Sequence, residues 1–404
     1  MTDSLFLTNS IQLPSGFSFS AVAAGMKASG RPDLALVNCS SGTTAAAVFT
    51  TNRVAAAPVH VGREALRASR GLVRAVIVNS GNANCATGEQ GVRSCQQVCR
   101  ATARGLGVKC HEVFPSSTGI IGVPLPVNRI VAKLPELVAK QAASAEAFRE
   151  FAQSIMTTDT RPKLACAAVP VRGGTATILG VAKGSGMIHP KLATMLVYLF
   201  TDMVAGPGSL RRTLIEICDQ TFNCISVDGD TSTNDTVLLL ASGRSEIPSN
   251  GAASNIFRGA LLEVCQSLAH QIVSDGEGIQ HVIELAVEDA RSREEALRVA
   301  RTIAHSPLVK TAWAGADPNW GRILAAIGNS GVPIKPSAVN IYIGQQQVCR
   351  GGCANGFDER AAHEHLSQSE CKVRVQIGRG RHAVRFYTTD LSAEYVRINA
   401  DYST

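Results

Sequence analysis

The chain has 404 residues, of which 45% are hydrophobic and 18% are charged. This composition predicts a folded protein with a large core, and it excludes disordered tails, collagen-like repeats and disulfide-stapled miniproteins. Lys and Arg number 39 against 32 Asp and Glu, a net charge of +7. Because no run of five basic residues occurs, the charge does not predict a nucleic-acid groove.

Short apolar runs alternate with amphipathic helical stretches along the whole chain. The run 72–78 predicts a buried strand, and the apolar spacing over 87–106 predicts a helix capped by Thr87. A second helix is expected to start at Ser144, and a hairpin turn is expected at 173–174. The alternation predicts a mixed α/β fold in which packed β-sheets are flanked by helices.

The second half of the chain continues the pattern. A helix is expected over 257–273, and a fresh strand begins at Ile283. The polar, glycine-rich stretch between them suggests a boundary near Gly278. We therefore expect a catalytic α/β domain over 1–278 and a smaller C-terminal α/β domain over 279–404.

Several other classes of protein are not indicated. The longest apolar stretches fall well short of the ~20 residues that a membrane span needs, and no basic segment precedes an apolar core at the start. We therefore expect a cytoplasmic protein. Twelve cysteines occur without a Cys-x-x-Cys pair, which favours buried free thiols. No metal site is expected, because 363–365 has the wrong histidine spacing and 228–239 lacks two residues of a calcium loop.

One loop suggests catalysis through a threonine. Ala193 precedes Thr194, which opens an apolar run, and Lys183 stands on the far side of the Gly- and Pro-containing loop. A threonine hydroxyl can attack the preceding carbonyl and release its own amino group, which then serves as its base. From spacing alone, a threonine held inside a buried strand is the better explanation, because Ala-Thr pairs are common.

The segment 187–196 belongs to a wider pattern with eight ordered blocks, which are 78–84, 117–122, 156–160, 182–187, 226–236, 274–278, 317–322 and 395–402. Through these segments, which are spread over nearly the full chain, the sequence resembles the ornithine acetyltransferase (glutamate N-acetyltransferase) family of arginine biosynthesis. Departures are few: Lys191 and Leu192 stand where the family more often has Asn and Met.

The resemblance implies a role for individual residues. Thr194 matches the nucleophile, with cleavage between Ala193 and Thr194 giving chains 1–193 and 194–404. Thr118 and Gly119 match the oxyanion hole, the first through its hydroxyl and the second through its N–H. The positions that match substrate contacts are Thr157, Lys183, Thr194, Glu277, Asn399 and Thr404.

The implied reaction is ping-pong transfer of acetyl from N2-acetylornithine to glutamate through an ester on Thr194. No cofactor is implied, and acetyl-coenzyme A stays open as a second acetyl donor. The two fragments are implied to remain together as a heterotetramer of two α and two β chains. An alternative enzyme is an N-terminal-nucleophile amidase or aminopeptidase that uses water as acceptor, and a non-enzymatic alternative is an uncleaved amino-acid-binding protein.

Overall fold

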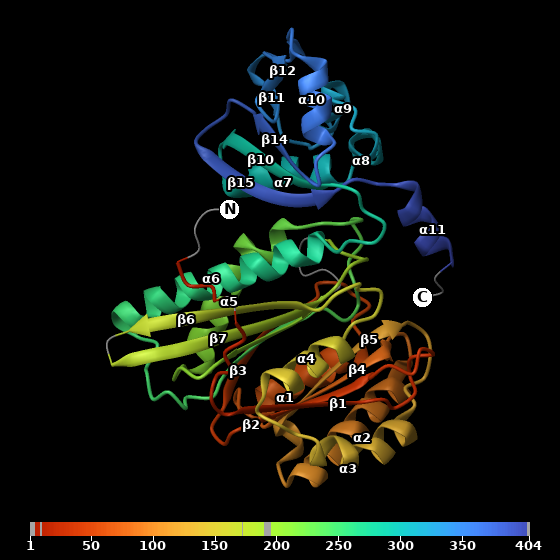
Figure 1. Cartoon of the computed structure of the whole chain (residues 1–404), viewed down its shortest axis with the longest axis vertical. Coiled ribbons are helices and arrows are strands. Elements are labelled where there is room, and N and C mark those ends of the chain that lie inside the picture. Colours follow the sequence, from red (N-terminus) through yellow and green to blue (C-terminus); the bar gives the residue numbers. More distant parts are fainter. Residues whose placement is uncertain (1–4, 9, 172, 190–194, 402–404) are drawn as a thin grey trace.

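The computed structural model describes residues 5–8, 10–171, 173–189 and 195–401. Within this part of the chain the strands form three sheets, arranged in a lower unit of two sheets and an upper unit of one (Figure 1). Helices flank all three sheets, so the mixed α/β fold predicted from the sequence is confirmed. No helix of the described chain is both long enough and apolar enough to cross a membrane.

The first sheet of the lower unit has four strands in the order β1-β2-β4-β5. Its strands are β1 (Phe17–Val22), β2 (Leu34–Cys39), β4 (Ala75–Asn82) and β5 (Val113–Ile120). One face packs against three helices, α1 (Ala57–Ala68), α2 (Gly88–Leu106) and α3 (Val127–Ala139). Alternate side chains of each strand supply this contact, as the period of two requires.

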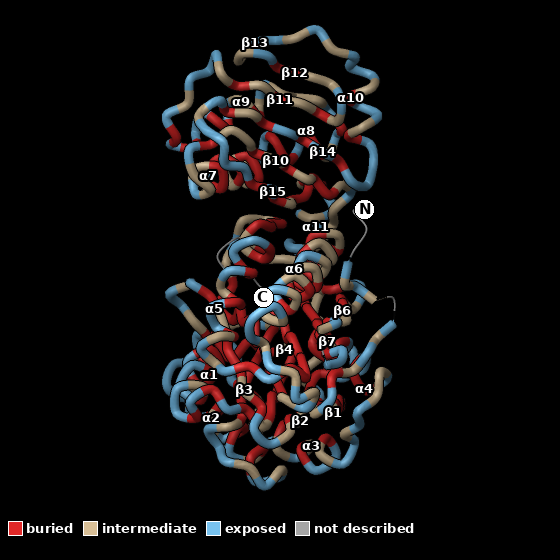
Figure 2. The backbone as a smooth tube through the Cα atoms, turned by 90° about the vertical axis from the view of Figure 1, so that its left-hand side faces the viewer, coloured by how far each residue is buried: buried red, intermediate tan, exposed pale blue. Residues whose placement is uncertain are grey.

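The second sheet has five strands in the order β3-β9-β8-β7-β6. They are β3 (Thr44–Phe49), β6 (Lys163–Val171), β7 (Gly174–Lys183), β8 (Leu196–Thr201) and β9 (Thr236–Ala241). Every residue of β8 and β9 is buried, because both faces of this sheet are covered. Figure 2 shows buried residues, in red, concentrated in the interior of the lower unit. One face packs on α5 (Pro207–Gln220) and α6 (Gly251–Val273).

The other face of the second sheet packs on the first sheet. An aromatic cluster fills this layer, in which Phe19 and Phe148 lie 5.0 Å apart and Phe19 and Phe200 lie 5.3 Å apart between ring centroids. Phe148 comes from α4 (Ala145–Ser154), which closes one edge of the layer. The lower unit is therefore a four-layer helix–sheet–sheet–helix sandwich.

The upper unit is built on a six-stranded sheet in the order β13-β12-β11-β14-β10-β15. Its elements are β10 (Val282–Ala290), α7 (Arg293–Ala304), α8 (Pro307–Ala314), α9 (Trp320–Gly328), β11 (Asn340–Ile343), β12 (Gln346–Arg350), β13 (Cys353–Ala354), α10 (Glu359–Leu366), β14 (Glu370–Gln376) and β15 (His382–Thr389). A core of its own lies between this sheet and its helices.

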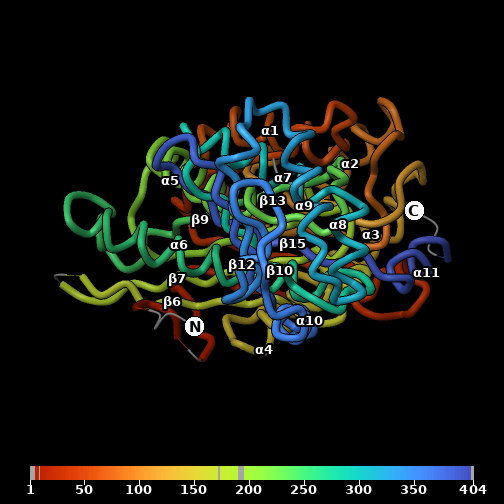
Figure 3. Tube along the Cα trace, turned by 90° about the horizontal axis from the view of Figure 1, so that it is seen from above, coloured from red at the N-terminus to blue at the C-terminus, as the bar shows by residue number. Residues whose placement is uncertain are grey.

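The last described helix, α11 (Ala393–Asp401), leaves the upper unit and lies at one side of the molecule (Figures 1 and 3). Its start packs on Gly278, where a Cβ would lie 2.4 Å from the Tyr395 nitrogen, and the Ser392 hydroxyl donates to the Gly278 carbonyl. Gly278 also has φ +63°, in the left-handed region that favours glycine. This contact brings the C-terminal helix next to the loop that carries Glu277.

Three local expectations are corrected by the structure. Thr87 does not cap α2, because its hydroxyl donates to the Asn84 side chain instead. The helix expected over 257–273 begins six residues earlier, at Gly251. Ten of the 12 cysteines are buried, but Cys110 and Cys353 are exposed, and none forms a disulfide.

Candidate active site

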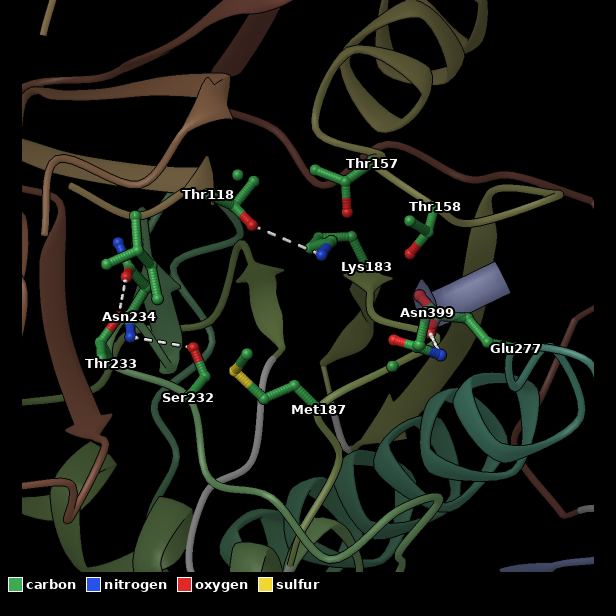
Figure 4. A pocket seen from close by; sticks show the side chains of 13 residues that line it. Thr118, Thr157, Thr158, Lys183, Met187, Ser232, Thr233, Asn234, Glu277 and Asn399 are labelled. Carbon is green, nitrogen blue, oxygen red and sulfur yellow. Dashed lines mark hydrogen bonds between the residues drawn. The ribbon is translucent and has the colours of Figure 1, made fainter. Parts of the chain in front are cut away.

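A pocket that is open to solvent lies where the ends of several strands of the lower unit meet α11. It gathers residues that are far apart in the sequence (Figure 4). Its lining consists of Thr118, Gly119, Ile121, Thr157, Thr158, Lys183, Gly186, Met187, Ser232, Thr233, Asn234, Glu277 and Asn399. Six of the residues that the sequence predicted are among them: Thr118, Gly119, Thr157, Lys183, Glu277 and Asn399.

Thr118 and Gly119 lie at the end of β5, next to the end of β4. The parallel register pairs Gly119 with Gly81, and Gly119 has φ +132°, a conformation that L side chains rarely adopt. A Cβ at Gly119 would lie 2.3 Å from the Gly81 carbonyl carbon, so the position also lacks room for a side chain. The Thr118 hydroxyl accepts a hydrogen bond of 3.4 Å from the Lys183 ammonium.

Lys183 reaches the pocket because it is the last residue of β7. It lies on the same face of the strand as Leu179 and Val181, which belong to the core between the two sheets. The antiparallel register sets Lys183 opposite Leu196, the first residue of β8. The loop that carries the predicted cleavage point therefore leaves and re-enters the sheet at neighbouring positions.

A buried network of charges holds the base of the pocket. Lys163 donates to Asp159 and to Asp275, both at 2.6 Å, and Lys183 lies 4.0 Å from Asp159. Asp159 also accepts from the N–H groups of Gly184 and Thr157. Burial opposes ionisation of Asp159, but the two lysines outweigh it and lower its pKa to about 2. Burial lowers the pKa of Lys183, and the charge of Asp159 opposes that shift.

Glu277 and Asn399 close the pocket on the side of α11. The Asn399 amide donates to the Glu277 carboxylate at 3.0 Å, and the Glu277 N–H donates to the Ser185 carbonyl. A Cβ at Gly186 would lie 2.3 Å from a Glu277 oxygen, so the carboxylate packs directly on this glycine. The pocket thus offers a carboxylate, an ammonium and several hydroxyls, a set that complements both charged ends of an amino acid.

Both ends of the loop between β7 and β8 are held tightly. In the first part of this loop, the Asp228 carboxylate accepts from the N–H groups of Met187 and Ile188 at 2.5 Å and 2.9 Å. Met187 has φ +57°, which is uncommon for a residue other than glycine. At the end of the loop, directly before β8, the Asp235 carboxylate accepts from the Met195 N–H at 2.9 Å. Ala193, Thr194 and Thr404 lie outside the described residues.

Comparison with known proteins gives the family. The model of the ArgJ family matches residues 18–404. Over 394 residues the chain is 44% identical to the arginine biosynthesis bifunctional protein ArgJ of Methylococcus capsulatus, a match that covers 96% of this chain and 95% of that protein. Over 395 residues it is 46% identical to the protein of the same name from Thermus thermophilus, with 98% and 100% covered.

This chain belongs to the ArgJ family. It is also similar to a solved structure, the ornithine acetyltransferase of Mycobacterium tuberculosis complexed with ornithine. The identity is 37%, the TM-score is 0.41, and the match covers 45% of this chain and 94% of that one.

The structure of this ArgJ-family chain also brings forward residues that the sequence analysis did not single out. Asp159 and Asp235 are buried and Asp228 is half-buried, and all three accept from backbone N–H groups beside the pocket. In the sequence, the stretch around Asp228 was considered as a calcium loop and rejected, and Asp228 itself was given no role. The sequence did contain a signal for them, because all three aspartates lie inside blocks 156–160 and 226–236 that carry the family resemblance. A carboxylate that becomes buried needs hydrogen-bond donors or positive charges beside it.

Proposed function

We propose that this protein is a self-processing acetyltransferase of arginine biosynthesis that moves the acetyl group of N2-acetyl-L-ornithine to L-glutamate. The observation that carries the proposal is a single pocket that joins Thr118, Gly119 and Lys183 to Glu277 and Asn399. Family membership over residues 18–404 supports the same reaction. Nothing in the proposed chemistry requires a metal or an organic cofactor, because the nucleophile belongs to the chain.

Self-processing begins with the loop between β7 and β8. The Thr194 hydroxyl attacks the Ala193 carbonyl, a carbon–oxygen bond replaces the carbon–nitrogen bond, and the hydroxyl proton passes to the departing nitrogen. Water then hydrolyses the ester and leaves chains 1–193 and 194–404, the second with a free amino group at Thr194. The backbone is fixed on both sides of the proposed cleavage point, at Met187 and Ile188 before it and at Met195 after it.

Acetyl transfer repeats the same chemistry on a substrate. The Thr194 hydroxyl takes the acetyl group from acetylornithine while its amino group accepts the proton, and ornithine leaves. The glutamate amine then attacks the ester and carries the acetyl group away. Both tetrahedral intermediates bear an oxyanion that the Thr118 hydroxyl and the Gly119 N–H are suited to receive, and one such donor is worth about 3 kcal/mol.

The charged residues of the pocket suit the two amino acids. We assign Glu277 to the side-chain ammonium of ornithine, and Thr157, Lys183, Asn399 and Thr404 to the remaining polar groups of the substrates. Acetyl-coenzyme A is a candidate second donor in a bifunctional enzyme. We further propose that the fragments stay together as a cytoplasmic heterotetramer of two α and two β chains.

The test is an acetyl-transfer assay on the purified protein, with acetylornithine and glutamate as substrates. Acetylglutamate should accumulate, and mass spectrometry should find a fragment that begins at Thr194. The Thr194→Ala variant, as the matched control, should remain one chain and form no product. Release of acetate without acetylglutamate would instead identify a hydrolase, and a single uncleaved chain in active wild-type preparations would refute the nucleophile.

A second arm replaces acetylornithine by acetyl-coenzyme A as the only acetyl source. Formation of acetylglutamate in that arm would establish the bifunctional reaction. Its absence, with transfer from acetylornithine intact, would restrict the protein to the single transfer.

A further inference from the structure

Asn234 lines the pocket but contributes no group to the proposed reaction. It lies in the loop before β9, beside Ser232 and Thr233, and it is 6% exposed (Figure 4). Its amide nitrogen donates to two backbone carbonyls, that of Ala83 at 2.7 Å and that of Ser117 at 2.8 Å. An amide nitrogen has two hydrogens, so neither is left for a substrate. Asn234 can therefore act on the site only through the chain that it holds.

Ser117 directly precedes the proposed oxyanion donors, Thr118 and Gly119. Its carbonyl belongs to the planar peptide unit that ends at the Thr118 Cα, so the hydrogen bond from Asn234 fixes where Thr118 begins. The Ser117 hydroxyl also donates to the Asn79 side chain at 2.6 Å. Ser117 is thus held at both its backbone and its side chain.

The second carbonyl that Asn234 holds connects to the other side of the two donors. Ala83 follows the end of β4, and its N–H donates to the Ile120 carbonyl at 2.9 Å. Ile120 directly follows Gly119. Asn234 therefore acts on both flanks of the donor pair, directly at the residue before it and through Ala83 at the residue after it.

The loop fixes the orientation of the Asn234 side chain. The amide oxygen accepts from the Thr233 hydroxyl at 2.6 Å, which leaves the nitrogen to face the two carbonyls. The backbone N–H of Asn234 donates to the Ser232 hydroxyl at 3.0 Å, and its carbonyl accepts from the Thr236 hydroxyl at 3.2 Å. Because Thr236 begins β9, which is buried along its whole length, the amide is anchored to the core of the second sheet.

We propose that Asn234 is a positioning residue of the oxyanion hole, because it holds the chain on both sides of Thr118 and Gly119. This inference rests on the proposed acetyl-transfer function. Oxyanion donors are effective when they are fixed in place before the charge develops. Loss of the amide should therefore weaken binding of the transition state and leave binding of the substrates unchanged. The kcat should fall while the KM values stay the same.

The experiment compares Asn234→Ala with Asn52→Ala in the full-length protein. Asn52 is the matched control, because its amide nitrogen also donates to a distant backbone carbonyl, that of Thr231 in the same loop, at 2.8 Å. The control variant loosens the loop and leaves the contacts of Asn234 in place. The readouts are cleavage at Thr194 by mass spectrometry, folding by circular dichroism, and the kcat and KM of acetyl transfer per cleaved chain.

We expect cleaved Asn234→Ala to lose about tenfold in kcat, with the KM values for acetylornithine and glutamate within about twofold of the wild type. Asn52→Ala should keep the wild-type kcat. A folded Asn234→Ala that remains uncleaved, while Asn52→Ala is cleaved, also supports the proposal, because self-cleavage passes through an oxyanion at the same donors. A wild-type kcat in cleaved Asn234→Ala, an equal loss in Asn52→Ala, or a rise in either KM that exceeds the fall in kcat overturns it.

Two further arms keep the test decisive. If Asn234→Ala does not fold, Asn234→Ser replaces it under the same criteria, because a serine hydroxyl can donate to only one of the two carbonyls. Failure of both variants to fold, while Asn52→Ala folds, would assign Asn234 to the stability of the fold and overturn the inference. A wild-type protein that is neither cleaved nor active refutes the proposed function, whereas an active wild type with an unaffected Asn234→Ala refutes this inference alone.

Discussion

Replacement of Asp159 by asparagine tests how far the buried charges determine the stability of the site. The carboxylate is fully buried and lies between two lysines, with Lys163 at 2.6 Å and Lys183 at 4.0 Å. It also accepts from the N–H groups of Thr157 and Gly184, so it links Thr157, a predicted substrate contact, to the residue that follows Lys183. The asparagine side chain has nearly the same shape but no charge.

The expected magnitude follows from the charge balance. In the wild type, two lysines face Asp159 and Asp275; in the variant, two lysines face Asp275 alone. Leaving one buried charge uncompensated costs about 3–5 kcal/mol. The pKa of Asp159, lowered from 3.8 to about 2, corresponds to about 2 kcal/mol. The free energy obtained from the pKa shift is smaller because it does not include the cost of leaving a buried lysine without its partner. We expect a loss of about 3 kcal/mol.

The assay is urea unfolding, followed by circular dichroism, in the Thr194→Ala background so that every protein is a single chain. Lys163→Met and the double variant with Asp159→Asn complete the cycle, because the double variant removes one charge of each sign. The double variant should lose at least 1 kcal/mol less than the sum of the single variants. Strictly additive losses, or a loss below 0.5 kcal/mol for Asp159→Asn, would refute the account of the network as mutually compensating charges.

Three more outcomes can be measured. Gly119→Ala should slow both cleavage and acetyl transfer about 100-fold. The added methyl group must push the strand away from Gly81 and so displace one oxyanion donor. Wild-type rates in the folded variant would show that Gly119 is not part of the site. Asn399→Ala should raise the KM for acetylornithine about fivefold, since Glu277 loses a hydrogen bond worth about 1 kcal/mol, with cleavage unchanged; an unchanged KM contradicts this role. Because the folded-state pKa of Asp159 lies below its ordinary value of 3.8, its contribution to stability should be complete above pH 4 and lost between about pH 4 and pH 2; acid titration of Asp159→Asn should lack that step.

Several local features of both units follow from local sequence rules. The hairpin at 173–174 joins β6 to β7 as expected, since two adjacent glycines tolerate the turn. Ser144 caps α4 through its hydroxyl, and Ser292 caps α7 in the same way. The cap expected at Thr87 is wrong because a nearby side chain, Asn84, competes for the hydroxyl.

The packing of the site could not be predicted in the same way. Lys163 and Asp275 are 112 residues apart, and no local pattern indicates that they form an ion pair. The need for glycine at 119 depends on the register between β4 and β5, which places Gly81 against it. Likewise, the hydrogen bond from the Met195 N–H to Asp235 is visible only once β8 and β9 lie side by side. The order of motifs in the sequence therefore predicted several residues that line the pocket. The interactions between its charged groups could be seen only in the folded structure.

Register is the physical reason that the pocket is assembled at this point. Three strand pairings, in two sheets, meet at one end of the sandwich. They are Lys183 with Leu196, Leu196 with Thr236, and Gly119 with Gly81. A slip of one residue in β7 would turn Lys183 toward α6 and break its contact with Thr118, because strand side chains alternate between faces. The buried apolar alternation of β7 on both faces prevents that slip. The hydrophobic core of the lower unit thus holds Lys183, Thr118 and Gly119 within one pocket.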